Sequence, residues 1–253
     1  MERFNLNVYG QDVTLSIDSR LYDPKNTTIL GPHDYFAPGT DSTLEIILSY
    51  GKRRRAFADD DFVQITHYRG KAGSHIIRQL VCYLAAYHSR AFDILHGTGL
   101  LVDSRKNLGV LLVGAAHCGK STLSAKLGDI VMDDDLMLVT RDKMRVAGKM
   151  GFVTYKRLES GRKYLTPLPN GVKEADLGLV FLLDKKQEGG TVLDVDNTIP
   201  RTYAGLDDLP PILRRAYLRL PPIRVNAPIF RLGTHGKLPQ TLQIAQYIID
   251  QHI

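Results

Sequence analysis

The sequence predicts an α/β protein with a mixed β-sheet, and three observations support this fold class. An apolar, strand-like run over 109–113 leads through a glycine-containing loop into a helix-like run over 121–127. The first seventy residues are rich in alternating strand patterns, and the next segment, 73–93, has helical periodicity. The elements do not repeat as strand–helix–strand units, so we expect a mixed sheet and not a doubly wound parallel one.

Residues 1–70 are predicted to form a β-rich N-terminal segment that precedes the core. Residues 4–9 and 13–17 alternate between apolar and polar side chains on either side of a turn at Gly10, which is the pattern of a β-hairpin. The further elements predicted here are strands at 44–50 and 62–68 and a loop at 22–42, which is rich in Pro and Gly.

Residues 71–253 are predicted to form the core, either as a second domain or as one continuous domain with the first segment. The core opens with a helix over 73–93. The helix over 121–127 is expected to end at Gly128, in the C′ position where glycine is favoured. The remaining predicted elements are strands at 100–102, 110–113, 130–132, 136–140, 151–155, 177–183, 191–195 and 228–232 and helices at 213–219 and 238–249.

Residues 114–122, Gly-Ala-Ala-His-Cys-Gly-Lys-Ser-Thr, match the phosphate-binding pattern G-x-x-x-x-G-K-[ST] in the strand–loop–helix context that this motif requires. Gly114 and Gly119 allow a tight turn and a close approach of the backbone to a ligand. Backbone N–H groups at the helix start, and Lys120 as an exposed point charge, would face the phosphates. The Ser121 hydroxyl can hold Mg²⁺. The predicted nucleotide-binding residues are Gly114, Ala115, Ala116, His117, Cys118, Gly119, Lys120, Ser121 and Thr122.

The pair His117-Cys118 is also similar to the start of the Cys loop of phosphatases. That chemistry needs an Arg six residues after the Cys to hold the phosphoryl group, and position 124 is Ser. We therefore expect Cys118 to be a small, semi-buried loop residue and not a nucleophile. The other cysteine, Cys82, lies in an apolar helical stretch, and the two together form neither a disulfide framework nor a zinc site.

A phosphate loop also needs a carboxylate to hold or orient the metal, and the sequence offers two candidates. Asp184 follows the apolar strand 177–183. The triplet 133–135, Asp-Asp-Asp, follows the strand 130–132 and begins only thirteen residues after Lys120. A conventional parallel sheet needs a longer crossover before its metal-binding strand, so this short spacing is unusual.

The segments 95–97, 114–121 and 128–134 together resemble the catalytic domain of HPr kinase/phosphorylase, whose core is shared with phosphoenolpyruvate carboxykinase. The similarity covers about residues 90–250. It implies a mixed-sheet P-loop kinase core and a Mg²⁺-dependent phosphotransferase, which is to say a kinase. The segment by which HPr kinases hold their protein substrate is not recognisable after residue 150.

The resemblance implies a role for each matching residue. Asp133 matches the general base toward the acceptor hydroxyl, and Asp134 matches the acid that positions Mg²⁺. Lys120 and Ser121 match the phosphate and metal ligands of the loop, and His96 matches a His near the reacting phosphates. The alternatives are a solvated turn for the Asp triplet and a hydrogen-bonded structural role for His96.

The phosphoryl donor would be ATP, or ADP or pyrophosphate, and the acceptor a hydroxyl of a protein or peptide serine or of a small molecule. One alternative is a nucleotide-binding regulatory protein without kinase activity. Another is an RNA kinase that uses the basic run 52–55, although this run is followed by three acids at 59–61. A second basic set is either a lid over the phosphates or a surface feature: Arg214, Arg215, Arg219 and Arg224.

The composition is that of an ordinary globular protein, with 43% apolar and 24% charged residues. The net charge of +6 is below what a dedicated nucleic-acid binder carries, so nucleic acid is not the expected partner. No signal pattern and no apolar run long enough for a membrane span is present. We therefore expect a cytoplasmic protein without a membrane partner, and we also expect a homo-oligomer.

Overall fold

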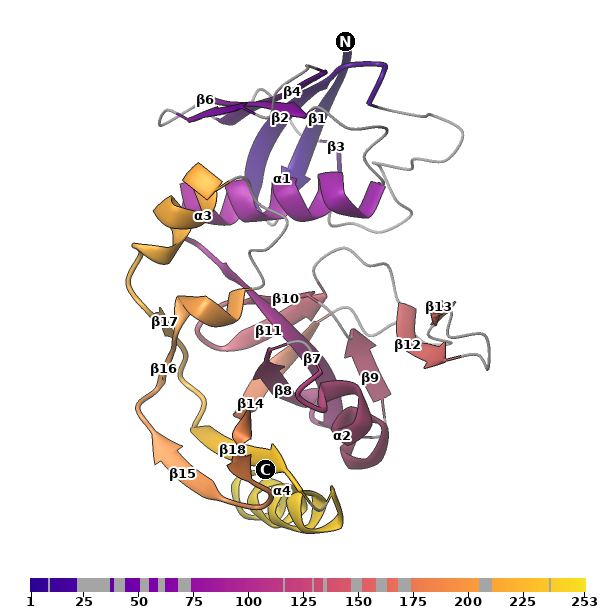
Figure 1. The fold of residues 1–253 in the computed structure, drawn as a ribbon, viewed down its shortest axis with the longest axis vertical. Coiled ribbons are helices and arrows are strands. Elements are labelled where there is room, and N and C mark those ends of the chain that lie inside the picture. The colour runs from indigo at the N-terminus through magenta and orange to yellow at the C-terminus, as the bar shows by residue number, and fades with distance from the viewer. Residues whose placement is uncertain are drawn as a thin grey trace. The chain divides into compact units, whose positions relative to one another are not determined.

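The structure of the 253-residue chain is a computed structural model (Figure 1). It describes residues 1–8, 10–21, 37–38, 44–50, 55–58, 62–67, 74–115, 117–128, 130–133, 136–146, 152–157, 163–167, 174–204, 211–236 and 238–253.

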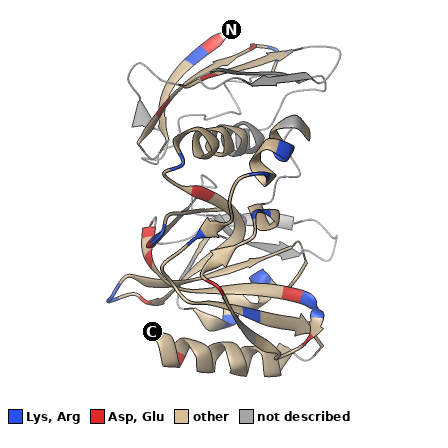
Figure 2. Cartoon of the chain, turned by 90° about the vertical axis from the view of Figure 1, so that its left-hand side faces the viewer, with Lys and Arg blue, Asp and Glu red and all other residues tan. Residues whose placement is uncertain are grey.

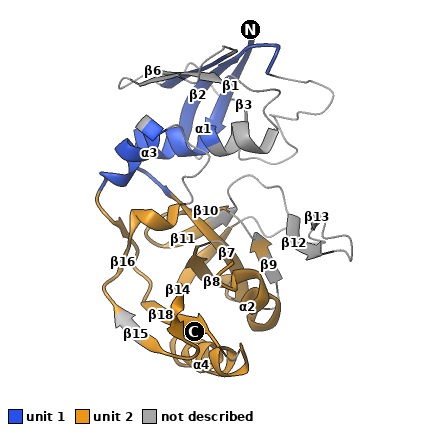
Figure 3. Ribbon diagram, viewed as in Figure 1, with its two compact units in different colours: residues 1–93, 206–220 blue, residues 94–205, 221–253 orange. Residues whose placement is uncertain are grey.

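The chain divides into two compact units (Figure 3). Unit 1 comprises residues 1–93 and 206–220, and unit 2 comprises residues 94–205 and 221–253. This division differs from the sequence-based boundary between residues 70 and 71, because the helix expected to open the core belongs to unit 1. A short segment from late in the sequence also returns to unit 1.

Unit 1 contains a mixed sheet of six described strands in the order β3-β1-β2-β4-β6-β5. The predicted hairpin is confirmed, since β1 and β2 pair antiparallel with Phe4 opposite Leu15. Their inward side chains, among them Leu6 and Leu15, are fully buried. The strands are β1 (Glu2–Val8), β2 (Gln11–Ile17), β3 (Ala37–Pro38), β4 (Leu44–Tyr50), β5 (Arg55–Ala58) and β6 (Phe62–His67). No strand was predicted at β5, whose first residue, Arg55, is the last residue of the basic run 52–55.

Unit 1 also contains two described helices. Helix α1 (Ser74–Ser89) buries an apolar face and ends earlier than the predicted residue 93, because Arg90 takes a left-handed φ of 57° that cannot continue a helix. Helix α3 (Pro211–Leu218) places Tyr217 edge-on against Tyr83 of α1, with ring centroids 5.8 Å apart. The Tyr217 hydroxyl also donates to Asp93 at 3.4 Å.

Unit 2 is built on a larger mixed sheet of eight described strands. The strands follow the order β11-β10-β7-β8-β14-β18-β15, and β9 pairs with β7. They are β7 (Asp93–Asp103), β8 (Leu108–Gly114), β9 (Ile130–Asp133), β10 (Leu136–Val139), β11 (Lys143–Val146), β14 (Glu174–Glu188), β15 (Val192–Val195) and β18 (Ile229–His235). The predicted mixed α/β class is confirmed.

Three parallel strands, β8, β14 and β18, form the centre of this sheet. Helices α2 (Lys120–Leu127) and α4 (Leu238–His252) pack on one face of it, over a buried apolar cluster that includes Leu112, Phe181 and Leu232. The carboxyl ends of parallel strands meet at one edge of a sheet. The loop after β8 therefore lies at the same edge as the last residues of β14 and β18.

The remaining elements of unit 2 are short. They are β12 (Phe152–Arg157), β13 (Lys163–Pro167), β16 (Thr198–Ile199), β17 (Ile223–Arg224) and a 3₁₀ helix, η2 (Arg201–Ala204). The prediction missed β11, β13, β16 and β17, and it gave β7 and β14 too few residues. In β7 the reason is local: Gly97 and Gly99 interrupt the apolar pattern that marks a strand.

Gly128 ends α2 as predicted, but its conformation differs from that of a typical C′ glycine. Its φ of −125° and ψ of 154° are those of extended backbone. A side chain here would instead meet Leu100, since a Cβ would lie 2.9 Å from both Cβ and Cδ1 of that residue. Glycine at this position therefore allows α2 to approach β7 closely.

No helix in the described residues is long and apolar enough to cross a membrane. Figure 2 shows that basic and acidic residues are interspersed along the described elements of both units.

Candidate functional site

The loop of residues 114–122 joins β8 to α2, so the predicted strand–loop–helix arrangement is confirmed. Two of its described residues have left-handed backbone, His117 at φ 62° and Gly119 at φ 99°. A Cβ on Gly114 would lie 2.5 Å from the Cys118 Sγ. Glycine is thus needed at 114 for space and at 119 for its backbone conformation. Ala116 lies outside the described residues.

Lys120 is held inside the loop, and the expectation of an exposed lysine was wrong. The residue is 6% exposed, and its Nζ donates to the carbonyl oxygens of Gly114 at 2.8 Å and Ala115 at 2.9 Å. It is the first residue of α2, from which the side chain extends back over the turn before it. The loop carbonyls thereby fix the position of one positive charge at the helix N-terminus.

The first turn of α2 presents the other polar groups of the loop. Ser121 and Thr122 are exposed. The Thr122 and Leu123 N–H groups donate to the Gly119 carbonyl at 3.1 and 3.0 Å, which closes the turn into the helix. The N–H groups at a helix start and the helix dipole favour a bound anion, so this geometry suits a phosphate.

Cys118 is buried, at 3% exposure, behind the loop. Burial raises the pKa of its thiol, and the positive charge of Lys120 opposes this rise without cancelling it. A raised pKa leaves less thiolate at neutral pH, and the thiolate is the nucleophile. The structure therefore agrees with the interpretation that Cys118 is a packing residue.

Cys118 is expected to react slowly with iodoacetamide. At pH 8 we predict alkylation at least tenfold slower than that of free cysteine, because both burial and the raised pKa lower the thiolate available. Mass spectrometry of the peptide that contains residue 118, against a time course in urea as the unfolded control, measures this. Alkylation as fast in the native protein as in urea would contradict the assignment.

Asp133 is the last residue of β9, and its backbone can be placed relative to the loop. It pairs with Gly99 of β7, which on its other side pairs with Leu111 of β8. Both β8 and β9 run antiparallel to β7, so they run parallel to each other. Asp133 therefore lies level with Leu111, about 10 Å away across two strand spacings, on a strand that runs toward the edge of the loop.

His96 lies on β7 beside the loop strand. Its neighbour Gly97 pairs with Val113, so His96 is level with Gly114, the first residue of the loop. The side chain is half-buried. This location fits both a role near the phosphates and a structural role.

The structure describes Asp184 but not Asp134, the other carboxylate candidate for the metal. Asp134 and Asp135 lie outside the described residues. Asp184 follows Leu183, which pairs directly with Gly114, so its backbone lies next to the loop. Its Oδ1 accepts a hydrogen bond from the Lys186 N–H at 2.9 Å. Among the described residues, no group of three or more His, Cys, Asp or Glu side chains could hold a metal ion.

The four arginines considered as a lid belong to different units. Arg214, Arg215 and Arg219 lie in or just after α3 of unit 1, and Arg224 lies in β17 of unit 2. All four are exposed.

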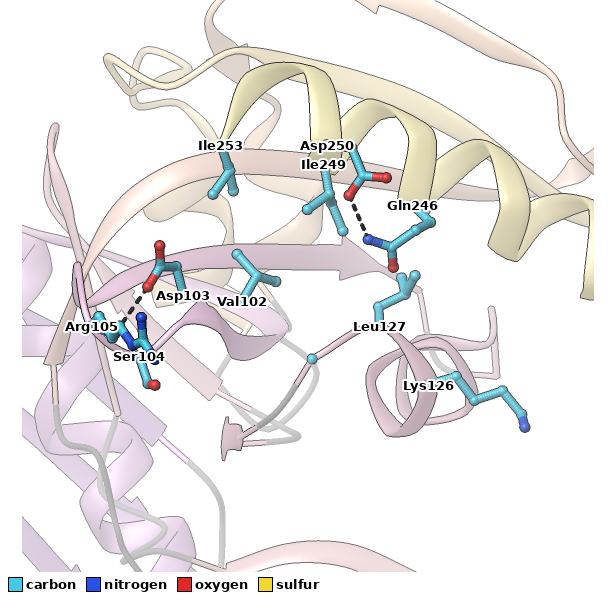
Figure 4. A pocket seen from close by; sticks show the side chains of 11 residues that line it. Val102, Asp103, Ser104, Arg105, Lys126, Leu127, Gln246, Ile249, Asp250 and Ile253 are labelled. Atoms are coloured by element: carbon cyan, nitrogen blue, oxygen red, sulfur yellow. Dashed lines mark hydrogen bonds between the residues drawn. The ribbon is translucent and has the colours of Figure 1, made fainter.

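A cavity of about 650 Å³ lies at the opposite end of α2 from the loop (Figure 4). Leu127, Ile249 and Ile253 form part of its apolar lining. Its acids already have partners: Asp103 accepts from the Arg105 N–H, and Asp250 accepts from Gln246. The backbone N–H of Lys106 holds the pKa of Asp103 below its ordinary value. An eight-residue helix is about 12 Å long, so this cavity is separate from the loop.

Sequence reasoning missed two residues near the loop, Lys185 at the end of β14 and Thr234 at the end of β18. Both line a cavity that also includes His117, Cys118 and Gly119. The signal that could have found them is their position at the carboxyl ends of strands parallel to the loop strand. That signal appears only once the strand order is known.

Comparisons with known proteins give distant similarity to solved structures alone. No family model matches the chain, and no curated protein matches it. Among solved structures, the chain is similar to the HPr(Ser) kinase/phosphatase from Coxiella burnetii, with a TM-score of 0.38 and 15% sequence identity. The similar region covers 63% of this chain and 96% of that chain.

Proposed function

We propose that this protein is a Mg²⁺-dependent phosphotransferase that moves a phosphoryl group from ATP, or from ADP or pyrophosphate, to a hydroxyl acceptor. The observation that carries the proposal is the Lys120 ammonium, fixed by the Gly114 and Ala115 carbonyls at the start of α2. A buried ammonium is costly for a fold to maintain, and a phosphate bound at the loop would interact favourably with this positive charge.

The loop would bind the phosphates and supply positive charge. Phosphoryl transfer needs little covalent chemistry from the protein, and catalysis depends on positioning and on neutralising charge. Backbone N–H groups before α2 and the Lys120 ammonium would serve both purposes. Their geometry is set before the ligand arrives, so little reorganisation is needed during the reaction.

Asp133 would act as the general base that accepts the proton of the acceptor hydroxyl. The support from the structure is the direction of β9, which runs parallel to the loop strand. The role of general base is what the resemblance of the sequence to HPr kinases implies for Asp133. His96, level with Gly114, would lie near the reacting phosphates.

The residue types that we assign to the metal suit a Mg²⁺ ion, which prefers oxygen ligands and keeps several waters. Ser121 would supply a hydroxyl oxygen and Asp134 a carboxylate, with Asp184 as the competing carboxylate. When bound, the ion neutralises negative charge on the phosphates. The chain would contribute the orientation of these ligands.

Asp134 and Asp184 can be distinguished by the Mg²⁺ requirement. We predict that Asp134→Asn raises the Mg²⁺ concentration for half-maximal activity by about tenfold or more, since loss of one metal contact weakens binding on this scale. Asp184→Asn should leave it within about twofold. A Mg²⁺ titration of both variants measures this, and the reverse pattern would transfer the metal role to Asp184.

The experiment that tests the proposed function is a screen for the acceptor. Serine, small alcohols, serine-containing peptides and RNA would be incubated with ATP or ADP labelled in the terminal phosphate. A labelled phosphoester on any of them supports the kinase. Nucleotide binding without transfer to any acceptor would favour the regulatory protein instead, and transfer only to RNA would favour the RNA kinase.

A further inference from the structure

A cavity of about 540 Å³ lies in unit 2, at the turn between β10 and β11. Arg141 of this turn forms part of its lining. The other described lining residues are 196–198, which lead into β16, and 224–226, which follow from the end of β17. Two arginines and one aspartate therefore meet at one cavity, although they come from three separate parts of the sequence.

This cavity is separate from the phosphate loop. The N–H of Leu177, near the start of β14, donates to the carbonyl oxygen of Asp142 in the turn at 2.7 Å. Leu183, near the other end of the same strand, pairs with Gly114 of the loop. The stretch of strand from Leu177 to Leu183 spans about 20 Å. A small molecule in this cavity would therefore not touch the loop.

Hydrogen bonds between the segments hold the walls of the cavity together. The Asn226 N–H donates to the Arg141 carbonyl at 2.7 Å, and the Asn226 side-chain amide donates to Asp142. Arg224 pairs with Thr198 across β16 and β17. Two residues span at most about 7 Å of chain, so the backbones of Arg224 and Asn226 are close, and Asn226 is bonded directly to Arg141. The two guanidinium groups thus extend from neighbouring positions.

The charged side chains of the lining lack partners. Arg141, Arg224 and Asp196 are exposed. None of the three makes an ion pair or a side-chain hydrogen bond with another described residue. Lys143, in the same turn region, is by contrast paired with Glu174 at 2.8 Å. The charges of the cavity are therefore available to a ligand.

The kinds of charge indicate the kind of ligand. Guanidinium groups bind carboxylates and phosphates through paired N–H donors. Asp196 disfavours a ligand that carries several negative charges, because like charges a few ångströms apart repel, but it attracts an ammonium group. Val225, at 3% exposure, is the apolar residue of the described lining, so there is little apolar surface to bind a large side chain. A small molecule with one carboxylate and one ammonium group would use all three charges.

We propose that this cavity binds a small α-amino acid, with its carboxylate on Arg141 and Arg224 and its ammonium group on Asp196. The proposal goes beyond the proposed function and does not depend on it, since the cavity and the loop are separate. A ligand of this size in an open cavity is expected to bind weakly, with a Kd of about 1 mM.

The test compares ligands that differ from L-alanine in one group. L-Alanine has no hydroxyl and therefore cannot be a phosphoryl acceptor. L-Lactate has a hydroxyl in place of the ammonium group, and L-alaninamide has a neutral amide in place of the carboxylate. Ligand-observed NMR titrations of the full chain would measure the Kd of each, with inorganic phosphate as a fourth probe. We expect L-lactate and L-alaninamide to bind at least about fivefold more weakly than L-alanine, and phosphate to bind no more tightly.

Variants of the lining identify the groups that bind. Arg141→Ala and Arg224→Ala should each raise the Kd for L-alanine by about tenfold, which is the loss expected for a hydrogen bond between charged groups. Asp196→Asn should weaken L-alanine by about threefold to tenfold and should not weaken L-lactate, so the preference between the two ligands should disappear. All three side chains are exposed, so the Tm should change little.

Two further variants serve as controls. Arg105→Ala removes an exposed arginine of unit 2 that does not line this cavity, and it should leave the Kd within about twofold. Lys120→Met should leave the Kd for L-alanine equally unchanged. Loss of L-alanine binding in Lys120→Met would mean that the amino acid binds at the loop, which would overturn this inference and leave the proposed function standing.

The remaining outcomes also decide the matter. The inference would be overturned if the wild type did not bind L-alanine at about ten times the expected Kd, or if it bound L-alanine and L-lactate equally. Unchanged affinity in both arginine variants would have the same consequence. Phosphate that bound more tightly than L-alanine, and lost affinity in the arginine variants, would identify a site for simple anions instead of amino acids.

Discussion

Replacing Asp133 with Asn is expected to lower turnover by about 10²–10⁴-fold, which is the contribution of a positioned general base. Asparagine keeps the size of the side chain but cannot accept the proton of the acceptor hydroxyl. A base of this kind acts in the transition state and contributes little to ground-state binding. Nucleotide affinity should therefore remain close to that of the wild type. Steady-state kinetics and calorimetry of the same preparation measure the two quantities.

Asp250→Asn is the matched control for this prediction. Asp250 is exposed on α4 and accepts a hydrogen bond only from the neighbouring Gln246 among the described contacts. The same change of charge there should leave turnover within about twofold. If Asp133→Asn and Asp250→Asn had equally small effects on turnover, Asp133 could not be the base.

Replacing Lys120 with Met is expected to weaken nucleotide binding by about 10²-fold. The methionine fills similar space without the charge, and loss of a buried, hydrogen-bonded charge next to an ionic ligand costs several kcal/mol. The structure predicts a second effect of this substitution, a loss of stability, which would not be expected if Lys120 were exposed. The Gly114 and Ala115 carbonyls lose their donor, so stability should fall by about 1–3 kcal/mol.

Lys126→Met is the matched control for both effects. Lys126 is an exposed residue in the last turn of the same helix, away from the loop. Calorimetry with Mg-ATP and urea unfolding should show both parameters near wild type for Lys126→Met and both reduced for Lys120→Met. Undiminished nucleotide affinity in a folded Lys120→Met variant would remove the loop from the binding site.

Local patterns in the sequence were enough to predict the elements that lead into the site. The strand before Gly114 and the helix after Gly119 follow from apolar runs on either side of a glycine-rich motif, and the structure confirms both. The hairpin of β1 and β2 follows in the same way from strict alternation. Each of these depends on residues that are close in the sequence.

Features that depend on side-chain hydrogen bonds or on the pairing of distant segments could not be predicted. Lys120 is buried because its ammonium bonds to carbonyls across the turn, and no local pattern signals this. Asp184 lies beside the loop because β14 pairs with β8 in one register, which only the strand order reveals. The same pairing brings Lys185 and Thr234 to the cavity beside the loop. Contacts of this kind arise from sheet assembly, to which residues far apart in the sequence contribute.

The fate of the terminal phosphate tests the central proposal most directly. Phosphorus NMR would follow ATP with the acceptor found in the screen, in parallel for the wild type and Asp133→Asn. We predict that the wild type converts the terminal phosphate into a phosphoester in the presence of Mg²⁺, and that Asp133→Asn forms this product at least 10²-fold more slowly. Only inorganic phosphate, released at equal rates by both proteins, would contradict a kinase that uses Asp133 as its base.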